Sequence, residues 1–156
     1  MKELVSFYLN GNKYGVQMSH MNAIENYSDM IHVPDMPEYL QGFVNIRDEM
    51  IPVVDIRRFL GQPPAGVSEE TKYILLRTAE GNFASLIDRV SDLLKVEDNA
   101  AMSMPALTSS EQKNYVDFVV KSGSDLILAL DPNQFLGAEE WKIMNEIRDK
   151  MEAQND

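Results

Sequence analysis

Short strand-like segments joined by tight turns dominate this sequence and constrain its fold more than any other feature. Apolar residues alternate with other residues through 4–9 and again through 13–18, and Asn10-Gly11-Asn12 between them offers residues that accept a positive φ. Further segments of this kind lie at 43–47, 50–55, 73–78, 83–87, 93–96, 115–121 and 126–130. Many short strands at close spacing, with few helices between them, favour small β-barrels over a sheet with alternating helices. The sequence therefore predicts a mainly β fold.

Helical signals are few and short until the end of the chain. Residues 56–60 fit one helical turn that Gly61 stops, and Asp131-Pro132 resembles an N-cap followed by proline at the first helical position. From residue 138 onward the apolar period becomes that of a helix. The apolar stripe consists of Ile143, Met144, Ile147 and Met151. We therefore predict short connecting helices and a C-terminal amphipathic helix over 138–153, docked on the barrels because exposed apolar stripes promote aggregation.

Two polar stretches interrupt the strand pattern. Residues 61–71 contain Pro and Gly and mark the best internal boundary, and residues 97–114 separate the strand candidates on either side. The 156 residues suffice for one domain or two closely packed lobes, because a domain of this size buries roughly two-thirds of its unfolded surface.

The charge balance indicates what kind of partner the protein can have. The chain carries 25 acidic and 14 basic residues, a formal net charge of −11, and its longest basic run is the pair Arg57-Arg58. A phosphate backbone or an anionic membrane surface is repelled by such a charge unless one face is locally basic. The sequence therefore predicts a protein partner and no nucleic acid.

Cysteine content and hydropathy indicate the compartment. The chain has no cysteine, which excludes disulfides, thiolate metal sites and a cysteine nucleophile. No apolar run approaches the roughly 18 to 20 residues that span a bilayer, and a strand pattern follows Met1-Lys2-Glu3 in place of a signal peptide. We therefore expect a cytoplasmic protein without direct membrane insertion.

Residue patterns typical of catalysis are missing from the sequence. His20 and His32 are the only histidines and have no second histidine at the helical spacing of a metal pair. The adjacent Asp48 and Glu49 are interpreted as a solvated turn, and Asp88 as a local acceptor of backbone hydrogen bonds. The sequence predicts no catalytic residue, no metal and no cofactor, and hence no enzyme.

One segment resembles a known signature. Residues 40–47, LQGFVNIR, followed by residues 51–57, IPVVDIR, resemble the signature of the CheW-type chemotaxis coupling proteins, in which G-x-x-N-L-R-G precedes P-V-V-D-L-R. Tyr14-Gly15-Val16 upstream and residues 86–94 and 127–131 downstream fall where other motifs of this family fall. The resemblance covers roughly residues 3–137.

The resemblance implies a fold and a function. The fold would be two intertwined SH3-like five-stranded β-barrels within a single CheW-like domain over 1–156. One lobe would contain about 13–68, the other about 1–12 and 69–137, and the C-terminal helix would follow at 138–153. The function would be that of a non-catalytic adaptor that joins the cytoplasmic tip of a chemoreceptor to the regulatory domain of the histidine kinase CheA, in membrane-associated receptor arrays.

The resemblance also implies residues that contact the receptor or the kinase. Met21, Val90 and Leu93 match apolar positions around the groove between the lobes, where a receptor helix is expected. Arg47 matches the signature arginine and would anchor the edge of that groove. Two positions depart from the family: Asp48 stands where the family has glycine, and Ala23 replaces a glutamate that often precedes Ile24. The predicted partner-binding residues are Met21, Ala23, Gly42, Arg47, Asp48, Val90 and Leu93.

Two other functions stay open at this point. The chain could be a divergent CheW-like protein of a specialised array that binds the kinase but not the receptor in the usual way, as the departures at Ala23 and Asp48 suggest. It could also be a small β-barrel that binds a nucleotide or single-stranded nucleic acid, a use to which five-stranded barrels are often put. The acidic charge balance opposes the second of these.

Overall fold

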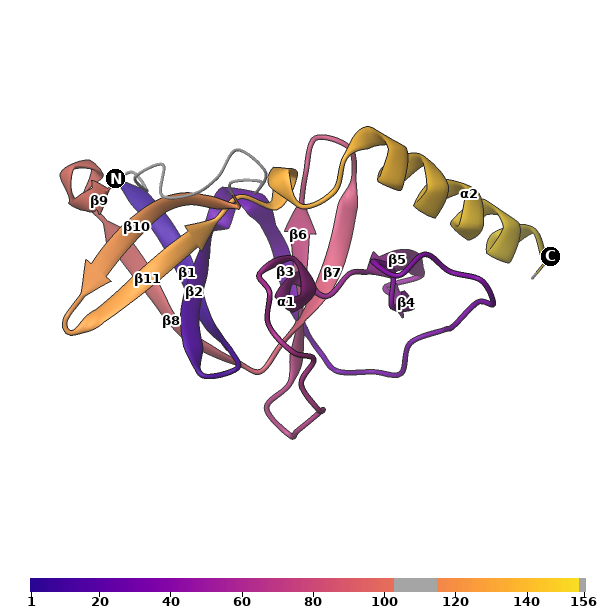
Figure 1. Ribbon diagram of the computed structural model, residues 1–156, viewed down its shortest axis with the longest axis horizontal. Coiled ribbons are helices and arrows are strands. Elements are labelled where there is room, and N and C mark those ends of the chain that lie inside the picture. Colours follow the sequence, from indigo (N-terminus) through magenta and orange to yellow (C-terminus); the bar gives the residue numbers. More distant parts are fainter. Residues whose placement is uncertain (103–114, 155–156) are drawn as a thin grey trace.

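The computed structural model describes residues 1–102 and 115–154 and arranges them as two β-sheets with one long C-terminal helix (Figure 1). The larger sheet has six strands in the order β8-β1-β2-β11-β10-β9. Its strands are β1 (Lys2–Leu9), β2 (Asn12–Gln17), β8 (Arg89–Val96), β9 (Ala101–Met102), β10 (Val116–Ser122) and β11 (Asp125–Leu130). Asn10 and Gly11 adopt positive φ angles of 50° and 82°, which confirms the predicted first hairpin.

The second sheet has five strands in the order β3-β6-β7-β5-β4. Its strands are β3 (Met21–Asn26), β4 (Gly42–Ile46), β5 (Glu49–Val53), β6 (Lys72–Arg77) and β7 (Asn82–Ile87). These two sheets confirm the predicted mainly β fold, but neither sheet closes into a full barrel through its strand pairing among the described residues. In place of two five-stranded barrels, residues 1–102 and 115–154 form one sheet of six strands and one of five.

The distribution of the chain between the two sheets differs from the lobes expected from the sequence. The chain passes from one sheet to the other only at η1 (Met18–His20) and at Asp88, within the described residues. Residues 12–17 pair with β1 because the tight turn before them folds them back. Residues 72–87 belong with β3, β4 and β5, because β6 pairs with β3. Residues 103–114 of the predicted polar stretch lie outside the described residues.

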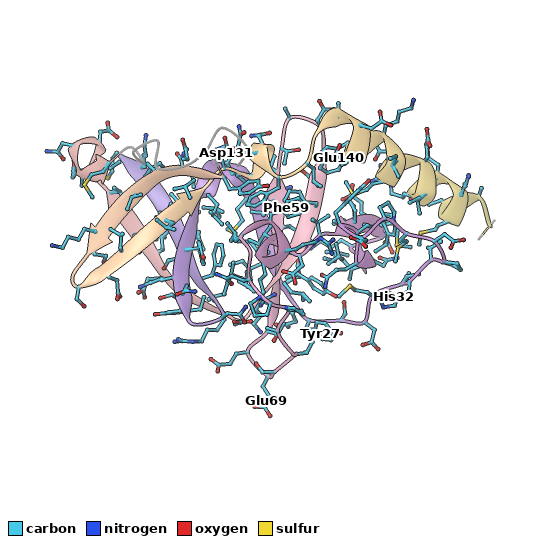
Figure 2. The ribbon with its side chains drawn as sticks, in the orientation of Figure 1. Tyr27, His32, Phe59, Glu69, Asp131 and Glu140 are labelled. Carbon is cyan, nitrogen blue, oxygen red and sulfur yellow. The ribbon has the colours of Figure 1, made fainter. Side chains whose placement is uncertain are left out.

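The largest buried cluster joins both sheets and the C-terminal helix. It includes Phe7 of β1, Phe43 of β4, Phe83 of β7 and Trp141 of α2 (Ala138–Gln154). Phe59, the last residue of the short helix α1 (Ile56–Phe59), lies near the centre of the molecule in Figure 2. Burial of these large apolar side chains holds the two sheets and α2 together.

The C-terminal helix packs against the protein, as the sequence predicts. Met144 and Met151 are buried and Ile147 is partly buried against the same cluster, whereas Ile143 of the predicted stripe does not belong to it. Trp141, one turn before Met144, belongs to the buried cluster in place of Ile143. None of the described helices is long and apolar enough to cross a membrane.

Tyr73 gives the folded chain a pH dependence. Its hydroxyl donates a 2.6 Å hydrogen bond to the Ser28 carbonyl, and desolvation by burial, together with nearby Tyr27 and Asp29, raises the pKa of Tyr73 to about 12. The folded state therefore keeps this proton at a pH where the unfolded chain has lost it. We expect the stability of the protein to fall as the pH rises from 10.0 toward about 12.

Absorbance titration of the tyrosines, with the Tyr73→Phe variant as control, measures the raised pKa of Tyr73 on which this prediction depends. The phenol that ionises near pH 12 in the unmodified protein should be missing in the variant. The prediction is wrong if both proteins give the same titration curve.

Candidate functional site

The signature segment forms the β4–β5 hairpin and its tip. Ile46 pairs with Glu49, so the turn consists of two residues, Arg47 and Asp48, with φ angles of 53° and 67°. Positive φ angles at both central residues of a two-residue turn match the twist of the flanking strands. The turn therefore lies one residue earlier than predicted, at Arg47 and Asp48 and not at Asp48 and Glu49. Glu49 instead begins β5. The hairpin therefore presents the Arg47 side chain at its tip.

Asp48 should reduce the stability of this turn. Aspartate tolerates the left-handed conformation at some cost, whereas glycine has no Cβ and adopts it freely. We expect Asp48→Gly to raise the free energy of unfolding by about 0.5 kcal/mol in urea denaturation. The matched control is Glu49→Gly, which places glycine in a strand and should lower the free energy of unfolding by about 0.5 to 1 kcal/mol. Destabilisation by both variants would contradict the prediction.

Arg47 makes an ion pair across the two edges of the five-stranded sheet. Its side chain is 80% exposed, and its Nη2 lies 3.0 Å from Oε1 of Glu25 on β3. The sheet therefore curves until the β4–β5 turn lies near β3, although the edges β3 and β4 do not pair. Because the Arg47 side chain is largely exposed, the ion pair contributes little to stability, and the guanidinium stays accessible to a partner.

Ala23 lies beside this ion pair. A hollow of about 170 Å³ is lined by Asn22, Ala23, Glu25, Ile46, Arg47, Glu49, Ile51, Leu75 and Asn82. The structure thus brings together Ala23 and Arg47, which are distant in sequence and were both predicted as partner-binding residues. A larger side chain at position 23 would enter this hollow.

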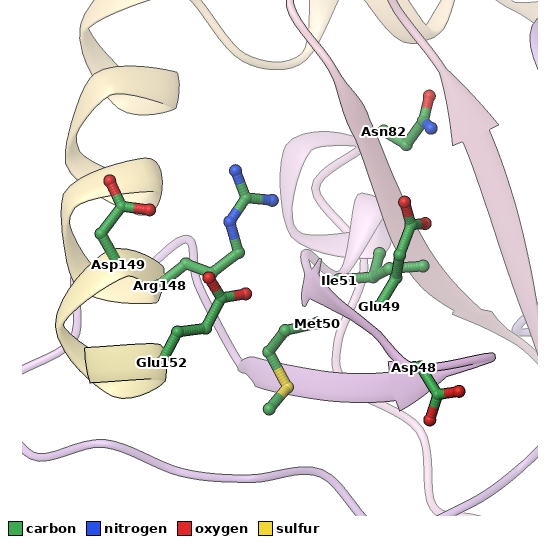
Figure 3. Close-up of a pocket in the computed structure, with 8 residues that line it drawn as sticks. All are labelled: Asp48, Glu49, Met50, Ile51, Asn82, Arg148, Asp149 and Glu152. Atoms are coloured by element: carbon green, nitrogen blue, oxygen red, sulfur yellow. The ribbon is translucent and has the colours of Figure 1, made fainter. Parts of the chain in front are cut away.

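A second hollow, of about 360 Å³, separates the hairpin from α2 (Figure 3). It is lined by Asp48, Glu49, Met50, Ile51, Asn82, Arg148, Asp149 and Glu152. Arg148 and Glu152 extend from α2 toward β5, and Arg148 donates a 2.8 Å hydrogen bond to Asn145 of its own helix. Four carboxylates and one guanidinium therefore line this hollow, and the environment of Asp48 is acidic.

Gly42 lets the hairpin backbone pack closely against the backbone at Ile31. A Cβ atom at this position would lie 2.8 Å from the Ile31 carbonyl oxygen, which accepts a 2.9 Å hydrogen bond from the Phe43 amide. Only glycine lets the two backbones approach this closely. The signature glycine is therefore needed for the fold of the hairpin, and it is buried.

The predicted apolar contact residues lie apart from the hairpin tip. Val90 and Leu93 are 38% and 56% exposed on β8, an edge strand of the six-stranded sheet. Met21 lies on β3 and packs in part against the main core. None of these three lines either of the hollows beside Arg47 and Asp48. Four of the seven predicted residues therefore lie at or beside the hairpin, Val90 and Leu93 lie on the edge of the six-stranded sheet, and Met21 lies apart from both groups on β3 of the five-stranded sheet.

The sequence did not reveal that the signature contains a buried charge cluster. The Arg57 side chain is only 2% exposed; its Nη1 donates to Oδ1 of Asp55 at 3.3 Å and to the Leu86 carbonyl at 3.2 Å. Its Nη2 forms an ion pair with Oδ1 of Asp88. Asp55 also caps α1 by accepting from the Arg57 amide. Asp88 accepts a backbone hydrogen bond, as predicted, but the donor is the amide of Asn10, which is distant in sequence, and not a neighbouring residue. Asp55 inside the apolar run 51–56, with Arg57 directly after that run, was the available signal for this cluster.

The described residues contain no group of three or more His, Cys, Asp or Glu side chains arranged to hold a metal ion. The charged groups near the hairpin are instead exposed or open to the hollows, where they can contact another macromolecule. Geometry and charge at this site suit recognition of a protein surface.

Comparisons with known proteins agree with this architecture. Chemotaxis protein CheW of Bacillus subtilis is 24% identical over 138 residues, which cover 88% of each chain. Chemotaxis protein CheW of Klebsiella aerogenes is 21% identical, with 94% of this chain and 88% of the relative covered. Among solved structures, the scaffolding protein TtCheW from Thermoanaerobacter tengcongensis superposes with a TM-score of 0.77 at 21% identity, covering 88% of this chain and 89% of the other.

The family assignment rests on the length of the matched segment. The family model described as CheW-like domain matches residues 3–140, so it includes both sheets and ends within the first turn of α2. The chain belongs to the CheW-like domain family.

Proposed function

We propose that this chain is a non-catalytic chemotaxis adaptor that couples the cytoplasmic tip of a chemoreceptor to the regulatory domain of the histidine kinase CheA. The observation that carries the proposal is the CheW-like family match over residues 3–140, which contains the β4–β5 hairpin and β8. The chain would work in the cytoplasm, recruited to membrane-associated receptor arrays.

The two groups of predicted contact residues support two different kinds of contact. Val90 and Leu93 are exposed apolar side chains that can pack against the apolar stripe of a helix, such as a receptor tip, with Met21 contributing from β3. Arg47, at 80% exposure, can donate charge-assisted hydrogen bonds to a partner carboxylate. Ala23, Gly42 and Asp48 shape the surface around Arg47.

Reversing the charge at the hairpin tip tests the role of Arg47. We expect Arg47→Glu to weaken binding of a receptor-tip helix about tenfold or more, because the new carboxylate repels an acidic partner and loses the pair with Glu25. Calorimetric titration with the purified receptor-tip helix and with the kinase regulatory domain measures both contacts. Lys121→Glu, the same reversal at an exposed site on β10, is the matched control and should leave both affinities unchanged.

The role of Arg47 is refuted if Arg47→Glu binds both partners as tightly as the unmodified chain. If the unmodified chain binds neither partner, the adaptor function itself is wrong.

A second function is supported by the surroundings of Asp48. This residue stands where the family has glycine, and it faces a hollow that also contains Glu49, Asp149 and Glu152. An acidic surface here suits a divergent adaptor that binds the kinase without engaging the receptor in the usual way. Capture of the kinase domain without capture of the receptor-tip helix, in the same titrations, distinguishes this function from the first.

A further inference from the structure

Asp88 is the single residue between β7 and β8, where the chain crosses from the five-stranded to the six-stranded sheet. Both of its carboxylate oxygens and its backbone amide are engaged. Oδ1 forms the ion pair with Arg57, Oδ2 accepts a 2.6 Å hydrogen bond from the Asn10 amide, and the Asp88 amide donates to the Tyr8 carbonyl at 3.0 Å. The crossing is therefore fixed by its side chain as well as by its backbone.

The partners of Asp88 come from both sheets. Arg57 lies on α1, which follows directly from β5 and so from the signature hairpin. Asn10 lies in the turn between β1 and β2 of the other sheet. A second link runs alongside, because the Asn10 side chain donates to the Pro63 carbonyl at 2.8 Å and the Gln62 side chain donates to the Tyr14 hydroxyl at 2.6 Å. Asp88 thus holds the hairpin side of the molecule to the β8 side.

The strand that begins after Asp88 depends on this contact for its position. β8 is an edge strand, so among the described strands β1 alone pairs with it, and the register between them shifts between Val5 and Phe7. Val90 pairs with Phe7 just before this irregularity, and Leu93 with Val5 just after it. Fixing the strand at Asp88 therefore fixes where the exposed Val90 side chain lies relative to the rest of the surface.

Stability alone does not account for a fully buried arginine at this place. Burying a charge pair costs desolvation free energy, and well-packed apolar residues often do as well or better in its place. Hydrogen bonds with fixed directions, in contrast, define a geometry that apolar packing leaves loose. Arg57 uses both of its Nη atoms, on three acceptors, to define the geometry of this crossing.

We propose that Arg57 and Asp88 are positioning residues for partner binding: the pair holds the start of β8 so that Val90 and Leu93 meet a receptor helix in the correct place relative to the hairpin. The inference rests on the proposed adaptor function and adds the residues that set the geometry of its apolar contact. Arg57 cannot touch the partner, because its side chain is only 2% exposed, and both oxygens of the Asp88 carboxylate are engaged by Arg57 and Asn10.

The test combines binding with hydrogen exchange. We expect Asp88→Asn to weaken binding of the receptor-tip helix about tenfold, because the amide group cannot accept from both Arg57 and Asn10. Affinity for the kinase regulatory domain should stay within about twofold. Amide exchange should accelerate in residues 89–93 and not in β4 or β5. Asp92→Asn, an exposed carboxylate on the same strand, 3.7 Å from Lys13, is the matched control and should change none of these quantities.

A second variant keeps the test valid if Asp88→Asn folds poorly. Arg57→Lys retains the charge, but one ammonium group cannot bind three acceptors in the geometry of a guanidinium, so it should cause the same selective loss of receptor binding. The inference is wrong if a folded variant of either kind loses thermal stability while its receptor affinity and its β8 exchange remain unchanged. If the unmodified chain binds neither partner, the proposed function has failed, and faster exchange in residues 89–93 of the variants then reports the positioning of β8 alone.

Discussion

Replacement of Arg57 by methionine is expected to lower the free energy of unfolding by about 3 to 5 kcal/mol, the usual cost of removing one partner from a buried ion pair. The variant leaves Asp55, whose side chain is only 11% exposed, and Asp88, which is 28% exposed, without their shared counter-charge. Water can reach Asp88 in part, which places the expected effect near the lower end of this range. Urea denaturation followed by far-UV circular dichroism gives the value.

The neighbouring arginine provides the control. Arg58 has a side chain that is 53% exposed and forms a surface ion pair with Glu38 at 2.5 Å. Arg58→Met removes the same charge one residue further on, and the expected loss is below about 1 kcal/mol because exposed ion pairs contribute little. Equal urea midpoints for the two variants would refute the structural role of the Arg57 cluster.

The strands and their tight turns were predictable because their signals are local. Alternating apolar residues and the turn residues Asn10 and Gly11 lie within one stretch of chain, and the structure has β1 and β2 there. The pairing of distant strands was not predictable in the same way. β2 pairs in parallel with β11, and β5 with β7, and no local residue pattern identifies such a partner. The lobe boundaries expected near residues 12 and 69 therefore differ from the observed division.

The candidate site was also predictable only where its signals are local in the sequence. The signature identified the hairpin and Arg47, but the partner of Arg47 is Glu25 on the opposite edge of the sheet and not one of the adjacent carboxylates. Likewise, the sequence identified Asp55 and Arg57 as part of the family signature without indicating that folding places them in the interior. Both differences have one cause: the position of a charge relative to the core is set by tertiary pairing, which neighbouring residues do not encode.

A similarly large effect is expected for the C-terminal helix. Trp141 is 3% exposed, and its ring packs edge-on against Phe83 at 6.3 Å between centroids. It also lies so close to Gly81 that a Cβ there would be 3.0 Å from Cζ3 of the indole. Trp141→Ala should lower the free energy of unfolding by about 3 to 5 kcal/mol, because it removes a large buried ring from its contact with Phe83 and leaves a cavity over β7. Urea denaturation measured by circular dichroism tests this value.

Lys142, the next residue of the same helix, is exposed and supplies the control. Lys142→Ala changes a side chain that lies outside the buried cluster, so the expected effect is within about 0.5 kcal/mol. Trp141→Phe should recover part of the loss, since a smaller ring still fills much of the space beside Phe83. If Trp141→Ala and Lys142→Ala unfold at the same urea concentration, α2 does not stabilise the sheets. Contacts other than those of the indole would then hold the part of α2 that lines the acidic hollow beside Asp48.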